Sequence, residues 1–260
     1  MRNLKSKRVV IKIGTNTLTN ESGFLDIETM KNLVSQIAAI KNKRDIVIIT
    51  SGAIGAGMRE LGLSEKPKDV VMKQVCAGIG QSILMANYYS LFSSHGIKIA
   101  QILLTYDDLA SKKTYANLRN TLERLLELGA IPIINENDPI SINEIGPSFG
   151  DNDNLSAMIA SKIKADLLVI LTNVEGLFDR NPDDKDAVMV KEVSRIDRKI
   201  ESMGSGSSKL GIGGMNMKIS AAKKAIQAGA TVIIASGKAQ DTLLRIIKNE
   251  DVGTIFHAKK

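Results

Sequence analysis

Short runs of β-branched residues alternate with helical patterns along almost the whole chain, and this alternation constrains the fold more than any other feature. Runs typical of buried strands lie at residues 8–13, 45–50, 98–105, 131–134, 166–172, 231–235 and 254–257. Helical patterns separate most of these runs, among them 27–40, 70–92 and 114–128. Strands joined by helices form a parallel sheet that is covered on both faces. The sequence therefore predicts an α/β protein, a three-layer αβα sandwich with a mainly parallel central sheet.

Segments rich in glycine, hydroxyl and amide groups directly follow five of the predicted strands. They lie at 14–16, 51–57, 135–138, 172–176 and 236–238. Because open α/β sheets bind ligands at the carboxyl ends of their strands, these segments predict one shared binding site. Segment 51–57 is typical of a glycine-rich turn whose backbone N–H groups approach a ligand. It has neither the glycine order of a dinucleotide site nor that of a P-loop.

The most polar of these segments opens a loop, 135–154, that crowds carboxylates and carboxamides between two apolar runs. The loop includes Asn135, Asp138, Asp151 and Asn152. Asp153 or Asn154 is expected to cap a helix over 155–163, so the end of the loop would meet unpaired helix N–H groups. A polar surface connection with two capping signals would have a similar composition. The position of the loop directly after a strand favours a binding site for a polar ligand.

Two lysines lie where they could bind a phosphate. Lys12 is near the end of the first strand pattern, and Lys218 is in the first turn of a helix that follows a glycine-rich segment. For Lys12, an edge-strand lysine that faces solvent is an equally good interpretation of the sequence alone. Ammonium groups and helix N–H groups together suit phosphoryl transfer. A carboxylate acceptor would need no general base, because an acid with a pKa of ~4.3 is ionised at pH 7.

The composition is that of an ordinary globular protein. The 260 residues carry a net charge of +7, which suits an anionic partner, but aromatic residues make up only 3% and Trp is absent, so nucleic acid is not the expected ligand. Cys76 is expected in the core, and His95 and His257 are expected to be structural. The sequence has no signal-peptide pattern and no apolar run near the ~18 residues of a membrane span, so we expect a cytoplasmic protein without a membrane partner.

The helical pattern over 70–92 is apolar on more than one face. A helix of this kind is buried against more than one neighbour, within the domain or against another subunit. This pattern predicts a homodimer contact.

Six segments carry a resemblance to a known family. In chain order, RVVIKIGTN, IVIITSGAIGAGM, IPIINENDPIS, FGDNDNLSA, LLVILTNVEGLF and GIGGMNMK resemble the amino acid kinase family across essentially the whole chain. The combination of SGAI, NEND, GDNDNLSA and GGM-x-x-K is more similar to the members that phosphorylate L-glutamate than to those that act on acetylglutamate, aspartate, carbamate or uridylate.

The resemblance implies ATP- and Mg²⁺-dependent phosphorylation of the L-glutamate γ-carboxylate to L-glutamyl 5-phosphate, the first step of L-proline biosynthesis, with feedback inhibition by L-proline. It also implies a homodimer or homotetramer. The single kinase domain, 1–260, would consist of a glutamate-binding and dimerisation half, about 1–165, and a nucleotide-binding half, about 166–260.

Matching motifs also imply roles for individual residues. Lys12 and Lys218 would stabilise charge on the transferring phosphoryl group, and Asp153 would hold the two ammonium ions in place. The residues expected to bind glutamate are Ser51, Gly52, Asn135, Asp138, Asp151 and Asn152. Those expected to line the nucleotide are Lys12, Gly14, Thr172, Asn173, Ile212, Gly213, Gly214, Met215, Asn216, Met217 and Lys218. The resemblance assigns no residue as a direct metal ligand.

The sequence departs from the family pattern at three places. Thr172-Asn173 stands where many members have Thr-Asp, which removes a charge near the nucleotide. The loop at 146–149 is longer than is usual, which could alter substrate fit or proline sensitivity. The chain ends at Lys260, so the expected form lacks the C-terminal PUA domain that many members append.

Two other interpretations remain open at this point. One is another member of the same family, an acetylglutamate or uridylate kinase. An acetylated substrate would leave the Asp138 carboxylate unpaired, at a cost of about 1–3 kcal/mol. The other is a regulator that senses nucleotides or binds nucleic acid without turnover. The presence of Lys12, Lys218 and Asp153 together favours an enzyme.

Overall fold

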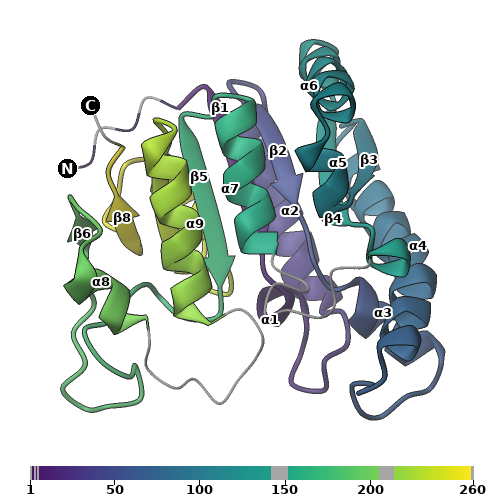
Figure 1. Ribbon diagram of the computed structural model, residues 1–260, viewed down its shortest axis with the longest axis horizontal. Helices are drawn as coiled ribbons and strands as arrows, with labels where there is room; N and C mark the ends of the chain where they lie inside the picture. Colours follow the sequence, from purple (N-terminus) through teal and green to yellow (C-terminus); the bar gives the residue numbers. More distant parts are fainter. Residues whose placement is uncertain (1, 3, 5, 142–151, 205–213, 259–260) are drawn as a thin grey trace.

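A computed structural model describes the chain except for residues 1, 3, 5, 142–151, 205–213 and 259–260. Its described strands form one sheet of eight in the order β3-β4-β2-β1-β5-β7-β8-β6 (Figure 1). The bounds of the strands are β1 Arg8–Ile13, β2 Asp45–Ile49, β3 Ile99–Leu104, β4 Ile131–Glu136, β5 Leu167–Thr172, β6 Glu192–Val193, β7 Thr231–Ser236 and β8 Thr254–Phe256. All pairs are parallel except β7 with β8. The prediction of a mainly parallel sheet is confirmed.

Helices cover both faces of this sheet. One face packs against α2 (Ile27–Lys41), α4 (Val70–Ser93) and α10 (Thr242–Ile247). The other packs against α6 (Lys112–Glu127), α7 (Asn152–Lys162) and α9 (Met215–Gln227), which lie in front of the strands in Figure 1. Alternate residues of one strand serve the two faces, since Val9 and Ile11 of β1 belong to the first core and Val10 to the second. The predicted three-layer αβα sandwich is therefore confirmed.

Shorter helices connect these layers. They are α1 (Thr15–Leu18), α3 (Ala53–Glu60), α5 (Tyr106–Ala110), the 3₁₀ turn η1 (Asp138–Ile140) and α8 (Arg198–Met203). Local signals account for several boundaries. The Asp26 carboxylate accepts a hydrogen bond from the Thr29 N–H at 3.0 Å and caps the beginning of α2. Gly129, at φ +74°, follows the end of α6 in a conformation that favours glycine.

The segment at 51–57 differs from its prediction as a glycine-rich turn. Only Ser51 and Gly52 form the turn, and the helix α3 begins at Ala53. Gly52 has φ +98°, a conformation that favours glycine, and it redirects the chain from β2 into this helix. The remaining glycines serve packing: a Cβ on Gly57 would lie 1.9 Å from the Cys76 carbonyl oxygen, so α3 and α4 touch backbone to backbone.

The helix α7 begins earlier than the sequence suggests. Asn152, Asp153 and Asn154 already lie within it, so neither of the last two is the residue that caps it. The prediction was wrong because these side chains have capping chemistry, but two of them are buried and contact other parts of the chain. Their position in the first helical turn fixes their direction relative to the sheet.

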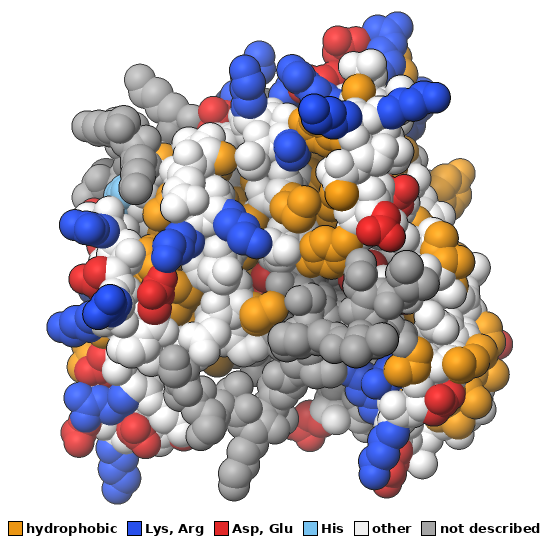
Figure 2. All heavy atoms as spheres, viewed as in Figure 1, with side chains coloured by type: hydrophobic (Ala, Val, Ile, Leu, Met, Phe, Trp, Pro, Cys, Tyr) orange, Lys and Arg blue, Asp and Glu red, His pale blue; other side chains and the backbone are white. Residues whose placement is uncertain are grey.

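The helix α4 leaves apolar side chains in solvent. Val71 is 63% exposed and Tyr89 is 67% exposed, while Cys76 is buried in the core as predicted. Figure 2 shows hydrophobic side chains gathered at the edge of the molecule where α4 lies. The homodimer contact predicted for this helix stays a prediction. Among the described helices, none combines the length and the hydropathy that crossing a lipid bilayer requires.

Candidate active site

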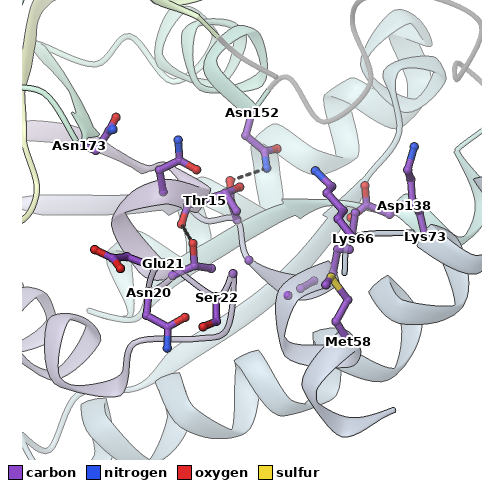
Figure 3. Close-up of a pocket in the computed structure, with 18 of the residues that line it drawn as sticks. Thr15, Asn20, Glu21, Ser22, Met58, Lys66, Lys73, Asp138, Asn152 and Asn173 are labelled. Atoms are coloured by element: carbon purple, nitrogen blue, oxygen red, sulfur yellow. Dashed lines mark hydrogen bonds between the residues drawn. The ribbon is translucent and has the colours of Figure 1, made fainter. Parts of the chain in front are cut away.

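A cavity of about 570 Å³ lies at the carboxyl ends of the central strands. Each of the five polar segments that follow strands contributes to its lining, as the sequence predicts for one shared site. The contributors include Thr15 after β1, Ser51 after β2, Asn135 and Asp138 at the end of β4, Asn173 after β5 and Lys238 after β7. Figure 3 shows Asn152 reaching into this cavity from the beginning of α7.

Next to the cavity, two lysines from distant parts of the chain meet one carboxylate. The ammonium nitrogen of Lys12 lies 2.5 Å from Oδ1 of Asp153, and that of Lys218 lies 3.1 Å from Oδ2. The exposed fractions of Lys12, Asp153 and Lys218 are 6%, 2% and 8%. Two ammonium groups and one carboxylate leave a formal charge of +1 in a place with little solvent. The arrangement can attract a further anion.

The charge state of Asp153 follows from competing effects. Its burial raises the pKa of the carboxyl group, but the charges of Lys12 and then Lys218 outweigh burial and lower the pKa below its ordinary value. The carboxylate is therefore ionised at neutral pH. Both of its oxygens already contact ammonium groups, so it is engaged in holding the lysines.

The position of β1 decides between the two interpretations of Lys12. The strand pairs with β2 on one side and β5 on the other, so it lies in the middle of the sheet. Lys12 is consequently not an edge-strand lysine, and that interpretation is wrong. Gly14 lies beside its ammonium group, because a Cβ on this glycine would be 3.4 Å from Nζ and 3.2 Å from the Leu171 carbonyl oxygen.

Asn152, which directly precedes Asp153 in the sequence, joins a buried network of amide groups. Its Nδ2 lies 2.9 Å from the Thr50 carbonyl oxygen, 3.0 Å from the Ser51 hydroxyl and 3.1 Å from Oδ1 of Asn135. The Nδ2 group of Asn135 in turn donates to Oε1 of Gln81 at 2.8 Å. This network joins β2, β4, α4 and α7. Residues that the resemblance assigns to one substrate thus lie in contact.

The Asp138 carboxylate lines the cavity itself. Asp138 begins η1 directly after β4 and is 8% exposed. Lys66 and Lys73 lie on the same side of the cavity (Figure 3). Burial and then the charge of Lys73 lower the pKa of the Lys66 ammonium group, while Asp138 raises it.

Sequence reasoning missed Lys66 and Lys73 as cavity residues. Lys66 lies between predicted elements, and Lys73 lies on a predicted helix with no motif around it. Only the positive charges of these two side chains, close to a glycine-rich segment, could have drawn attention to them. Gln81 was missed for the same reason, since a glutamine within an apolar helix pattern has no distinctive spacing.

The residues expected around a nucleotide come from the other half of the sheet. Thr172 ends β5 and is buried, and its hydroxyl donates to Oδ1 of the exposed Asn173 at 3.3 Å. Gly214 precedes α9, and Met215, Asn216, Met217 and Lys218 form its first turn. Asp151, Ile212, Gly213 and the loop at 146–149 lie outside the described residues.

The donor groups near the cavity bear on how a magnesium ion would be bound. Within the described ranges, no three His, Cys, Asp or Glu side chains lie close enough together to hold a metal ion. Mg²⁺ commonly binds through substrate phosphates with one or two protein carboxylates and several waters. The described donors therefore fit a magnesium ion carried by a nucleotide, and they do not fit a closed protein cage.

Comparison with known proteins identifies the family of the chain. The sequence model of the Amino acid kinase family matches residues 7–236. Among solved structures, UMP kinase from Ureaplasma parvum superimposes with a TM-score of 0.64 at 14% identity, covering 97% of this chain and 99% of that one, which shows a shared fold. The chain belongs to the amino acid kinase family.

Two curated relatives give a finer classification. The protein from Methanosarcina barkeri is 44% identical over 97% of this chain and 69% of its own length. That from Dehalococcoides mccartyi strain CBDB1 is 50% identical over 96% of this chain and 68% of its own length. Both carry the name glutamate 5-kinase, and this chain belongs to their branch of the family.

Proposed function

We propose that this protein transfers the γ-phosphoryl group of ATP to the γ-carboxylate of L-glutamate, which gives L-glutamyl 5-phosphate and begins L-proline synthesis. The observation that carries the proposal is the contact of Lys12 and Lys218 with Asp153 beside a polar cavity. The family and the named relatives support the choice of reaction and substrate.

The chemical step needs charge neutralisation more than proton transfer. The acceptor carboxylate is ionised at pH 7, so it can attack phosphorus without a general base. Negative charge spread over the transferring phosphoryl oxygens would be stabilised by the Lys12 and Lys218 ammonium groups, which Asp153 holds in place before substrate arrives. Positioning the ammonium groups in advance avoids the cost of reorganising them during the reaction.

Glutamate recognition would divide between the two ends of the substrate. The Asp138 carboxylate would bind the α-ammonium group, and donors around Ser51 and Gly52 would bind the α-carboxylate. Asn135 and Asn152 would contribute from the network between these positions. The cavity also exposes Lys66 and Lys73, whose charge would favour a dicarboxylate over a neutral amino acid.

ATP would lie over the β5 and β7 side of the sheet. Thr172, Asn173 and the first turn of α9 would line it, together with Gly14, Gly214 and the Ile212 and Gly213 that lie outside the described residues. A magnesium ion bound to ATP supplies further neutralisation of phosphate charge when present. The halves 1–165 and 166–260 would then serve glutamate and nucleotide, respectively. We also propose feedback inhibition by L-proline and assembly as a homodimer or homotetramer, in which the exposed face of α4 would be covered.

A substrate panel tests the proposal. ADP release should require ATP, Mg²⁺ and L-glutamate together, and N-acetylglutamate and UMP should not replace glutamate. Turnover with either alternative and none with glutamate would contradict the substrate while leaving the kinase class intact. Nucleotide binding without any turnover would instead indicate a regulator. Adding L-proline to the glutamate reaction tests the inhibition separately.

Asp138→Asn tests how the substrate is recognised. Loss of a charge-assisted hydrogen bond to the ammonium group should raise KM for L-glutamate by about 10- to 100-fold, because such bonds contribute about 1.5–3 kcal/mol. KM for ATP should not change. Asp107→Asn, an exposed carboxylate in α5, is the matched control and should behave as wild type.

A further inference from the structure

Gln81 lies behind the glutamate site, and no part of the proposed mechanism uses it. It belongs to the middle of α4, is 8% exposed and is not among the residues that line the cavity. Its Oε1 accepts a hydrogen bond from Nδ2 of Asn135 at 2.8 Å. Among the described residues its Nε2 group has no partner, although the nitrogen is buried. A buried donor without a partner is unfavourable, so the orientation of this amide calls for a reason.

The reason lies in the direction of the hydrogen bonds. A carboxamide has donors on one end and an acceptor on the other, so fixing one end fixes the other. Because Gln81 presents an oxygen, Asn135 must turn its Nδ2 toward it. The Oδ1 of Asn135 then faces Asn152 and accepts from its Nδ2 at 3.1 Å. The same direction runs through the whole series, and at its far end the Thr50 carbonyl oxygen accepts from Nδ2 of Asn152 at 2.9 Å.

At the end of this series, Asn152 presents an acceptor. Its Nδ2 is directed at Asn135, the Thr50 carbonyl oxygen and the Ser51 hydroxyl. Its Oδ1 is buried and has no partner among the described residues, while the residue lines the cavity (Figure 3). A buried carbonyl oxygen without a described partner, on a residue that lines the cavity, fits a ligand that donates, and the α-ammonium group of an amino acid is such a donor.

We propose that Gln81 is a positioning residue that holds the Asn135 amide, and through it Asn152, in the orientation in which the site presents a carbonyl oxygen to the α-ammonium group of the substrate. This inference rests on the proposed function. Without the oxygen of Gln81, the buried Nδ2 group of Asn135 loses its hydrogen-bond acceptor. Reversing the Asn135 amide would place its Nδ2 against Nδ2 of Asn152, donor against donor, so neither orientation of Asn135 is satisfied.

The test uses Gln81→Met, which has a similar size but no carbonyl oxygen. KM for L-glutamate should rise about tenfold, the effect of one hydrogen bond, while kcat changes less than about twofold and KM for ATP stays constant. Gln81→Leu removes the same oxygen if the methionine variant does not fold. Gln81→Glu keeps an acceptor oxygen and should restore KM to within about threefold of wild type.

Glutarate has the two carboxylates of the substrate but no ammonium group. It therefore distinguishes an effect on hydrogen-bond direction from an effect on packing around the cavity. Its inhibition constant against L-glutamate should be the same in wild type and Gln81→Met, because it has no donor for Asn152 to accept. An equal loss for glutarate and glutamate would overturn the inference, since it would indicate a general distortion of the cavity.

Gln36→Met is the matched control. Gln36 is also a buried glutamine whose Oε1 accepts a hydrogen bond, from the Leu243 N–H at 2.9 Å, but it lies in α2 outside the cavity. This variant should be less stable than wild type with an unchanged KM for L-glutamate. If Gln81→Met and Gln36→Met have the same KM, the inference is wrong and the proposed function stands. A wild-type protein that does not phosphorylate L-glutamate overturns both.

Discussion

The ammonium group of Lys12 in the central strand lies 2.5 Å from Oδ1 of Asp153 in the first turn of α7. This contact joins the sheet to a helix that packs on it, in an interior from which water is almost excluded. The other oxygen of Asp153 contacts Lys218 of α9, so one carboxylate fixes cations from two further elements. Substituting Lys218 and substituting Asp153 should therefore have different effects.

Lys218→Ala should lower kcat by about 10²–10³, because it removes one preorganised donor to the transferring phosphoryl group. KM for L-glutamate should change little, since the lysine would act on the phosphoryl group and not on the amino acid. Steady-state kinetics with varied glutamate at saturating ATP measures both values. Lys223→Ala on the same helix is the control, because this exposed lysine pairs with Glu201 at the surface, at 2.6 Å. Full kcat in a folded Lys218→Ala protein would exclude the mechanism.

Asp153→Asn should destabilise the fold as well as the activity. Without the carboxylate, two buried ammonium groups lose their common counter-ion, and breaking a buried ion pair in this way typically costs about 3–5 kcal/mol. Urea unfolding measures the change in the free energy of unfolding. Glu250→Gln is the comparison, because its pair with Arg245 is almost half exposed and should be worth no more than about 1 kcal/mol. Equal losses of unfolding free energy in the two variants would mean that the buried contact contributes no more to stability than the exposed pair.

The stability should also depend on pH through Asp153. Its pKa is lower in the folded protein than in the unfolded chain, where it is about 3.9, so the unfolded state takes up the proton first as the pH falls. The contribution of Asp153 is thus fully present above about pH 4 to 5 and is lost as the pH falls through the folded-state pKa. Wild type should lose stability more steeply than Asp153→Asn across this acid range. Parallel curves for the two proteins in urea titrations would contradict the assignment.

Gly80→Ala should be strongly destabilising, because a Cβ at this position would lie 1.8 Å from the Ala53 carbonyl oxygen and 2.4 Å from the Gly57 nitrogen. The two helices would have to separate, at a cost of at least about 1–3 kcal/mol, and α3 would shift the Ser51 turn at its start. Thermal unfolding and KM for L-glutamate should both respond.

Gly78→Ala provides the matched control on the same helix. The nearest atom to its added Cβ is Cγ of Pro139 at 3.7 Å, an ordinary van der Waals contact. Since alanine is favoured over glycine in a helix interior by about 0.5–1 kcal/mol, this variant should be as stable as wild type or slightly more so. A Gly78→Ala protein that loses as much stability as Gly80→Ala would show that backbone contact between α3 and α4 is not the cause.

Local pattern was sufficient for most of the architecture. The β-branched runs gave the positions of seven strands, because burial on both faces of a parallel sheet requires such residues. The eighth, Glu192–Val193, has only two residues and pairs at the edge, where no run of apolar residues is needed. The helix α3 was missed because glycines, which usually favour turns, serve here as contact points for α4.

The sequence by itself determined the fold class, the edge of the sheet where the cavity lies, and the family motifs that include Lys12, Asp153 and Lys218. Each depends on residues close together in the chain or on a short motif. Only the tertiary structure decided that Lys12 lies in a central strand, that both lysines contact one carboxylate, that Lys66 and Lys73 line the cavity, and that Gln81 contacts Asn135 behind it. These relationships join residues from separate elements. The distances between such residues are set by how the three layers pack, and a local sequence pattern carries no information about that packing.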